Sequence, residues 1–159
     1  MGECYLNLEN HVQSEYHYQK ALKLNNENDS AWFGLGLVMW VEKKWEESIL
    51  FIKKALKIDE LNPEYWLILA KVYNENFLTD DAEHALMKAV ELEPENTEIW
   101  LTWVEIFVKF RDIFKAIRIL RSGMKKNNDP LLKYRLVSLL LEVKREKDAF
   151  MWLKKAMKQ

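Results

Sequence analysis

The sequence has few of the residues that interrupt helices or crosslink chains. Among its 159 residues are only 4 glycines, 3 prolines and 1 cysteine. So few turn-forming residues exclude a protein built of many short strands, and they favour a mostly helical fold. The single cysteine, Cys4, excludes an intrachain disulfide and a cluster of thiolate metal ligands, and we expect it to be an ordinary reduced thiol.

Long apolar segments are also lacking. The first residues, MGECYLNLEN, have neither the basic start nor the apolar core of a secretory signal. The run AWFGLGLVMWV ends before Glu42 and has about half of the ~20 residues that a helix needs to cross a bilayer. We therefore expect a cytoplasmic protein that does not insert into a membrane.

Catalytic and metal-binding motifs are lacking as well. The three histidines, His11, His17 and His84, offer no pair at the i,i+4 spacing of a metal site, and we expect them to be exposed or partly packed. A dinucleotide-binding motif that began at Gly34 would need a glycine where Met39 stands. No Gly-x-Ser-x-Gly sequence occurs. We predict that the protein is not an enzyme and has no cofactor.

The overall composition, 49% hydrophobic and 31% charged with a net charge of -1, is typical of a folded chain with a sizeable core. The balance of charge hides an asymmetry. Residues 1–96 contain 9 Lys and Arg against 18 Asp and Glu, whereas residues 97–159 contain 15 against 7. The N-terminal part is therefore acidic and the C-terminal part basic.

The chain also contains an internal repeat of about 34 residues. Trp32, Trp66 and Trp100 are 34 residues apart. Four further series keep nearly the same step: Ser14, Ser48, Ala82, Ala116 and Ala149; Ala21, Ala55, Ala89, Gly123 and Ala156; Tyr18, Ile52, Leu86, Leu120 and Leu153; Tyr5, Met39, Tyr73, Phe107 and Leu140. Apolar residues within each period fall at helical spacing and predict two helices of about 13 residues. Helices this short are not stable alone in water, so they must bury their faces on their neighbours.

The repeat resembles the tetratricopeptide repeat, whose 34-residue unit carries an early Trp, a Leu-Gly pair, a Tyr, spaced alanines and a late Pro. Residues 63–96 match this pattern through Trp66, Leu69, Ala70, Tyr73, Ala82, Leu86, Ala89 and Pro94. The resemblance covers essentially the whole chain. It implies an all-α fold, a right-handed α-solenoid superhelix of antiparallel helix pairs in a single array. The units would be 1–28 (partial), 29–62, 63–96, 97–129 and 130–159.

The later units depart from the family pattern. Trp103 and Val104 replace the usual Leu-small pair, Gly123 takes an alanine place, and Lys133 stands where the early aromatic is expected. These units are still in register.

The stretch NDSAWFGLGLVMW, residues 28–40, is predicted to be a first helix capped near Asp29 or Ser30. Asn62 and Asp129, each followed by a proline, are predicted to cap later first helices. Residues predicted to face the repeat interior are Trp32, Leu35, Gly36 and Met39, with Gly36 at a close helix crossing. Residues predicted to face the other side are Phe33, Gly34, Leu37 and Trp40.

The two ends of the array predict a further property. By register, Met1-Gly2 align with Leu35-Gly36, so the first unit begins inside its first helix, and Gln159 follows soon after the last helix. Solenoids usually carry a polar capping helix at their ends. We expect either a piece of a longer array or self-association, for which the acidic and basic parts favour head-to-tail contact.

In the resembled family, the first helices line a concave groove that binds extended or helical peptides. Carried over by register, the groove residues are Phe33, Leu37, Trp40, Val41, Leu67, Lys71, Leu101, Glu105 and Tyr134. The family's carboxylate clamp is not reproduced, because Gly34, Leu37 and Glu64 stand at its places. The resemblance implies a protein-interaction scaffold that binds an apolar or mildly basic segment. Alternatively, the N-terminal groove residues pack against the missing half-unit or a neighbouring helix.

The basic C-terminal part raises a second function, association with RNA. Lys115, Arg118, Arg121 and Lys125 recur every three or four residues, and Tyr134 or Phe110 would have to stack on bases. Such a stripe is more often a solvated convex face, so protein is the favoured partner over nucleic acid. The alternatives to a peptide-binding scaffold are thus an RNA-associated scaffold and a self-associating structural fragment.

Overall fold

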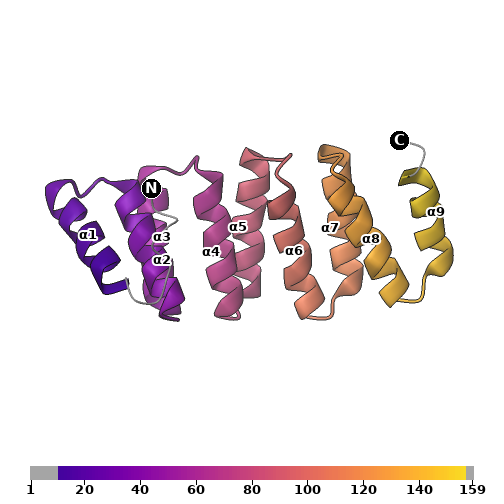
Figure 1. The fold of residues 1–159 in the computed structure, drawn as a ribbon, viewed down its shortest axis with the longest axis horizontal. Helices are drawn as coiled ribbons and strands as arrows, with labels where there is room; N and C mark the ends of the chain where they lie inside the picture. Colours follow the sequence, from indigo (N-terminus) through magenta and orange to yellow (C-terminus); the bar gives the residue numbers. More distant parts are fainter. Residues whose placement is uncertain (1–10, 157–159) are drawn as a thin grey trace. The chain divides into compact units, whose positions relative to one another are not determined.

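The computed structural model describes residues 11–156, and this part of the chain is made of helices without a strand (Figure 1). The helices are α1 (His11–Leu24), α2 (Asp29–Val41), α3 (Trp45–Ile58), α4 (Pro63–Glu75), α5 (Thr79–Leu92), α6 (Thr97–Lys109), α7 (Ile113–Lys126), α8 (Pro130–Glu142) and α9 (Glu146–Ala156). The all-α prediction is confirmed. The expectations for Cys4, for the Met1-Gly2 alignment and for Tyr5 lie outside the described residues.

The helices follow the register of the sequence repeat. The first helices α2, α4, α6 and α8 begin at residues 29, 63, 97 and 130, where the predicted units begin. Each is followed after a short turn by a second helix, and Figure 1 shows the two helices of a pair running in opposite directions. The predicted antiparallel pairs are confirmed.

The helices group into two compact bodies. The N-terminal body extends to Lys88 and the C-terminal body starts at Ala89, so the division falls inside α5. Within residues 11–156, no helix combines the length and the apolar character that a membrane span requires.

Asparagine and aspartate side chains cap the first helices. Asn28, one residue before the predicted position, caps α2, since its side chain accepts a hydrogen bond from the Ala31 amide at 2.9 Å. The predicted cap at Asp29 or Ser30 was therefore wrong. Asp29 is instead the first helical residue, where its carboxylate is free to contact another helix. The predicted caps at Asn62 and Asp129 are confirmed.

The close crossing predicted at Gly36 is confirmed in the N-terminal body. A Cβ atom on Gly36 would lie 2.6 Å from Cγ1 of Ile52, which is fully buried on α3. The buried hydroxyl of Ser48 donates a hydrogen bond to the Gly36 carbonyl oxygen at 2.7 Å. Leu35 and Met39 are buried as predicted. Because Gly36 has no side chain, the backbone of α2 packs directly against the Ile52 side chain of α3.

The C-terminal body has its own core around Trp100, which is 4% exposed and packs with Val104, Leu120, Leu136 and other buried side chains. The Trp100 indole N–H donates to the Pro94 carbonyl oxygen at 2.8 Å. A Cβ atom on Gly123 of α7 would lie 2.8 Å from the Trp100 ring. Gly123 therefore leaves the room that the Trp100 ring occupies.

The turns inside the helix pairs contain a recurring strained residue that the sequence did not predict. Lys43, Phe77, Arg111 and Lys144 all have φ near +60° and stand at the same place of each pair. The amide of Lys43, for example, donates to the Trp40 carbonyl oxygen at 2.9 Å. Left-handed backbone costs a non-glycine residue about 1–2 kcal/mol. Glycine is the usual residue at this position after a helix.

A Lys43→Gly variant is therefore expected to gain about 1 kcal/mol in the free energy of unfolding, because glycine adopts this backbone without strain. Lys53→Gly is the matched control, since the same substitution in the middle of α3 is expected to cost about 1 kcal/mol. Urea unfolding followed by circular dichroism measures both. Equal destabilisation of the two variants would contradict the strain at Lys43.

Candidate partner-binding surfaces

The predicted groove residues of α2 and α4 divide into a buried and an accessible set. Phe33 and Leu67 are 8% and 5% exposed. The Phe33 ring stacks on the Tyr65 ring with 4.4 Å between centroids, and so it joins α2 to α4. Phe33 thus packs on a neighbouring helix, which is the alternative that the sequence left open. Gly34 is buried as well, since a Cβ atom there would overlap the Tyr18 ring of α1.

A hydrogen bond accompanies this aromatic pair. The Tyr65 hydroxyl donates to the Asp29 carboxylate at 2.7 Å. Burial, together with the hydrogen bond to Asp29, raises the pKa of Tyr65 to about 12. The pair holds the first helices of two successive repeats together, which fixes the spacing of any side chain that projects from them.

The accessible part of this surface consists of Leu37, Trp40, Val41 and Lys71, which we call the N-terminal groove face. Val41 is 38% exposed and the other three are partly exposed. One turn after Lys71, the side-chain oxygen of Asn74 is buried and accepts no hydrogen bond from a described residue. An unsatisfied buried acceptor of this kind costs about 1–3 kcal/mol.

The C-terminal body exposes a more prominent apolar surface on α8, the first helix of the predicted unit 130–159. Tyr134 is 75% exposed, and Leu131 and Leu141 on the same side of α8 are 56% and 51% exposed. We call these three residues the α8 stripe. Of the other predicted groove residues, Leu101 is partly exposed and Glu105 is exposed. Leu141 was not among the predicted groove residues, although its helical spacing from Tyr134 indicates the same side of the helix.

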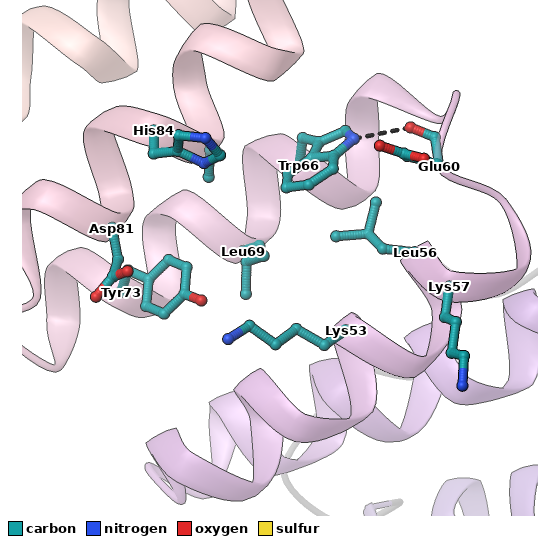
Figure 2. Close-up of a pocket in the computed structure, with 10 residues that line it drawn as sticks. Lys53, Leu56, Lys57, Glu60, Trp66, Leu69, Tyr73, Asp81 and His84 are labelled. Carbon is teal, nitrogen blue, oxygen red and sulfur yellow. Dashed lines mark hydrogen bonds between the residues drawn. The ribbon is translucent and has the colours of Figure 1, made fainter.

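A pocket of about 450 Å³ opens elsewhere in the N-terminal body (Figure 2). Its lining comes from α3, from α4 and from α5 before the division of the bodies, with Glu60 from the turn between α3 and α4: Lys53, Leu56, Lys57, Glu60, Trp66, Leu69, Tyr73, Asp81, His84 and Ala85. On α4, the residues at i, i+3 and i+7 from Trp66 face this pocket, whereas Leu67 and Lys71 lie on roughly the opposite side of the helix. In the sequence, Trp66 and Tyr73 were identified only as repeat positions, so the pocket was not predicted.

The basic stripe of α7 is shorter than the sequence predicted. Lys115 is partly buried, with its ammonium 3.9 Å above the centroid of the Phe107 ring. Arg118, Arg121 and Lys125 are exposed, and Phe114 beside them is 71% exposed. Binding of RNA at this stripe and head-to-tail self-association both stay predictions.

The histidines lie as expected. His17 and His84 are exposed and His11 is partly buried. In the described part of the chain, no three His, Cys, Asp or Glu side chains gather where they could hold a metal ion.

Known proteins share the repeat and the fold. Residues 63–96 match the family model of the tetratricopeptide repeat. No curated protein sequence matches the chain significantly. The crystal structure of MamA, 17% identical, matches with a TM-score of 0.77 over 99% of this chain and 93% of that chain.

Two further solved structures are similar at low sequence identity. PilF from Pseudomonas aeruginosa is 19% identical with a TM-score of 0.76, over 99% of this chain and 72% of that chain. YrrB, a TPR protein with an unusual peptide-binding site, is 21% identical with a TM-score of 0.69, over 99% and 81% of the two chains. These likenesses concern the fold.

Proposed function

Because the chain is a tetratricopeptide-repeat protein, we propose that it is a single repeat array whose first helices bind an apolar or mildly basic peptide segment of a partner protein. The fold is one of interaction scaffolds, and the helices present side chains that the repeat packing does not use. Each body carries one surface that could supply the contacts, the N-terminal groove face in the N-terminal body and the α8 stripe in the C-terminal body.

The observation that supports this function most strongly is the exposure of the α8 stripe. Three large apolar side chains, Leu131, Tyr134 and Leu141, are each more than half exposed on one side of a helix whose other sides are buried. Burying them against a partner would contribute ~1.5–3 kcal/mol each. Association removes an estimated ~4–15 kcal/mol of such a gain. We expect micromolar or weaker affinity.

The polar groups near the groove residues indicate the character of the segment. Glu64 and Glu105 are exposed on first helices and favour a basic residue in the ligand. A strongly acidic peptide would meet like charge at either glutamate.

A selected peptide with a site-specific crosslinker tests this function. Peptides are selected from a random phage-displayed library on the full chain, and benzoylphenylalanine then replaces Tyr134 in one variant and Phe114 in another. Both positions are aromatic and similarly exposed, at 75% and 71%, but Tyr134 belongs to the α8 stripe and Phe114 to α7. We expect crosslinking from position 134 and little from position 114. Selected peptides that crosslink only from position 114 would refute the proposal.

A further inference from the structure

The pocket in the N-terminal body has an apolar wall whose shape is held in advance. Leu56, Leu69, Tyr73 and Ala85 are almost fully buried and form its inner surface. The Trp66 indole N–H donates to the Glu60 carbonyl oxygen at 2.8 Å, which fixes the ring at one end of the pocket (Figure 2). A volume of about 450 Å³ lies within the usual range of ligand sites. The wall therefore suits one large apolar group.

One cation reaches into this pocket. Figure 2 shows the Lys53 side chain extending across the pocket below Leu69, whereas the Lys57 ammonium points away from it. The Lys53 ammonium lies 5.5 Å from the centroid of the Tyr73 ring and makes no ion pair with a described residue. His84 stands on the far side of the opening. Lys53 and His84 are both exposed, and an anion between them would form a charge-assisted hydrogen bond with the lysine ammonium.

The carboxylates of the lining are placed toward the ends. Asp81 lies beside Tyr73, and Glu60 lies beside Trp66 (Figure 2). Asp81, which has no ion pair with a described residue, can accept a hydrogen bond from a ligand N–H. The pocket thus offers a cation at its middle, an acceptor at one end and an aromatic wall at the other.

From this arrangement we propose that the pocket binds an apolar carboxylate, in which a carboxylate stands a few bonds from an aromatic or large aliphatic group. The carboxylate pairs with Lys53, and the apolar group packs on Trp66 and Leu69. The C-terminal residue of a peptide that ends in Phe or Leu has this chemistry, and so does a small carboxylic acid. An internal Asp or Glu does not, because its carboxylate and an apolar group do not belong to one residue. This site lies on the side of α4 opposite Lys71 and is independent of the groove.

Indole N–H signals in nitrogen-15 spectra of the full chain test the site. The signal of Trp66 is identified with Trp66→Phe, and the chain is titrated with N-acetylphenylalanine, with its amide, and with 3-phenylpropionate. We expect N-acetylphenylalanine to shift the Trp66 signal saturably with a Kd of about 1 mM, as the size of the ligand allows. The amide, which has no carboxylate, is expected to bind at least about tenfold more weakly.

Two lysine variants test whether Lys53 or Lys57 binds the carboxylate of the ligand. Lys53→Met, which keeps the length of the side chain, is expected to weaken N-acetylphenylalanine at least about tenfold, and Lys57→Met less than about twofold. Unchanged signals of the other indoles show that both variants are folded. Binding of the amide as tight as that of the acid, or equal effects of the two variants, would overturn the proposal. Tighter binding of N-acetylphenylalanine than of 3-phenylpropionate supports a peptide terminus as the ligand, and equal binding supports a small carboxylic acid.

Discussion

A Trp100→Ala variant is expected to lose about 3–5 kcal/mol of its free energy of unfolding, the usual cost of truncating a buried tryptophan. The ring is 4% exposed in the core of the C-terminal body, and its N–H is bonded to the Pro94 carbonyl oxygen. The residue that faces the ring, Gly123, has no side chain that could move into the space. The cavity would therefore persist, which places the expected loss toward the upper end.

Urea unfolding followed by circular dichroism measures this loss. Phe114→Ala is the control, because Phe114 is 71% exposed and its truncation is expected to change stability by less than about 0.5 kcal/mol. A second substitution tests the cause. Gly123→Ala is expected to destabilise the natural chain by overpacking against Trp100, and to be neutral or stabilising when Trp100 is alanine. A loss below about 1 kcal/mol for Trp100→Ala would show that the cluster is not packed as described.

The fold could be predicted from the sequence because its packing is periodic. Every helix pair must bury the same kind of face on its neighbours, so tryptophan recurs near the start of α2, α4 and α6, and small residues recur in the second helices. The close crossing at Gly36 followed from the same register, since the tetratricopeptide pattern has a small residue at this position. The cap of α2 was misplaced by one residue because Asn28, Asp29 and Ser30 are all good caps.

The accessible surface was harder to predict, because exposure depends on the side chain of another helix. Phe33 and Tyr134 stand at equivalent places of their repeats, yet Phe33 is covered by Tyr65 and Tyr134 is 75% exposed. The register shows which side of a helix a residue occupies. It does not show whether a residue of another helix covers that side, as Tyr65 covers Phe33.

Neither the pocket nor the strained turns could be predicted from the sequence repeat. The pocket depends on how far side chains such as Lys53 and Trp66, from different helices, reach toward one another. The positive φ at Lys43 could not be read from its residue type, since glycine is the residue that usually marks such a turn. In both cases three-dimensional packing supplies information that spacing along the chain lacks.

A Tyr134→Ala variant is expected to weaken binding of a selected peptide by about 10- to 100-fold, because exposed tyrosines in the centre of an apolar surface are frequent hot spots of binding. The side chain is 75% exposed, so its truncation leaves the fold nearly unchanged and acts on the partner contact alone. Leu131 and Leu141 flank Tyr134 and would exclude water from around it in the complex.

Calorimetric titration of the selected peptide into the natural chain, Tyr134→Ala and Phe114→Ala tests the scaffold function most directly. If the first helices bind the partner, Tyr134→Ala raises Kd at least about tenfold and Phe114→Ala, on α7, leaves it within about twofold. Equal Kd values for the natural chain and Tyr134→Ala, or a larger loss with Phe114→Ala, would contradict binding at the α8 stripe.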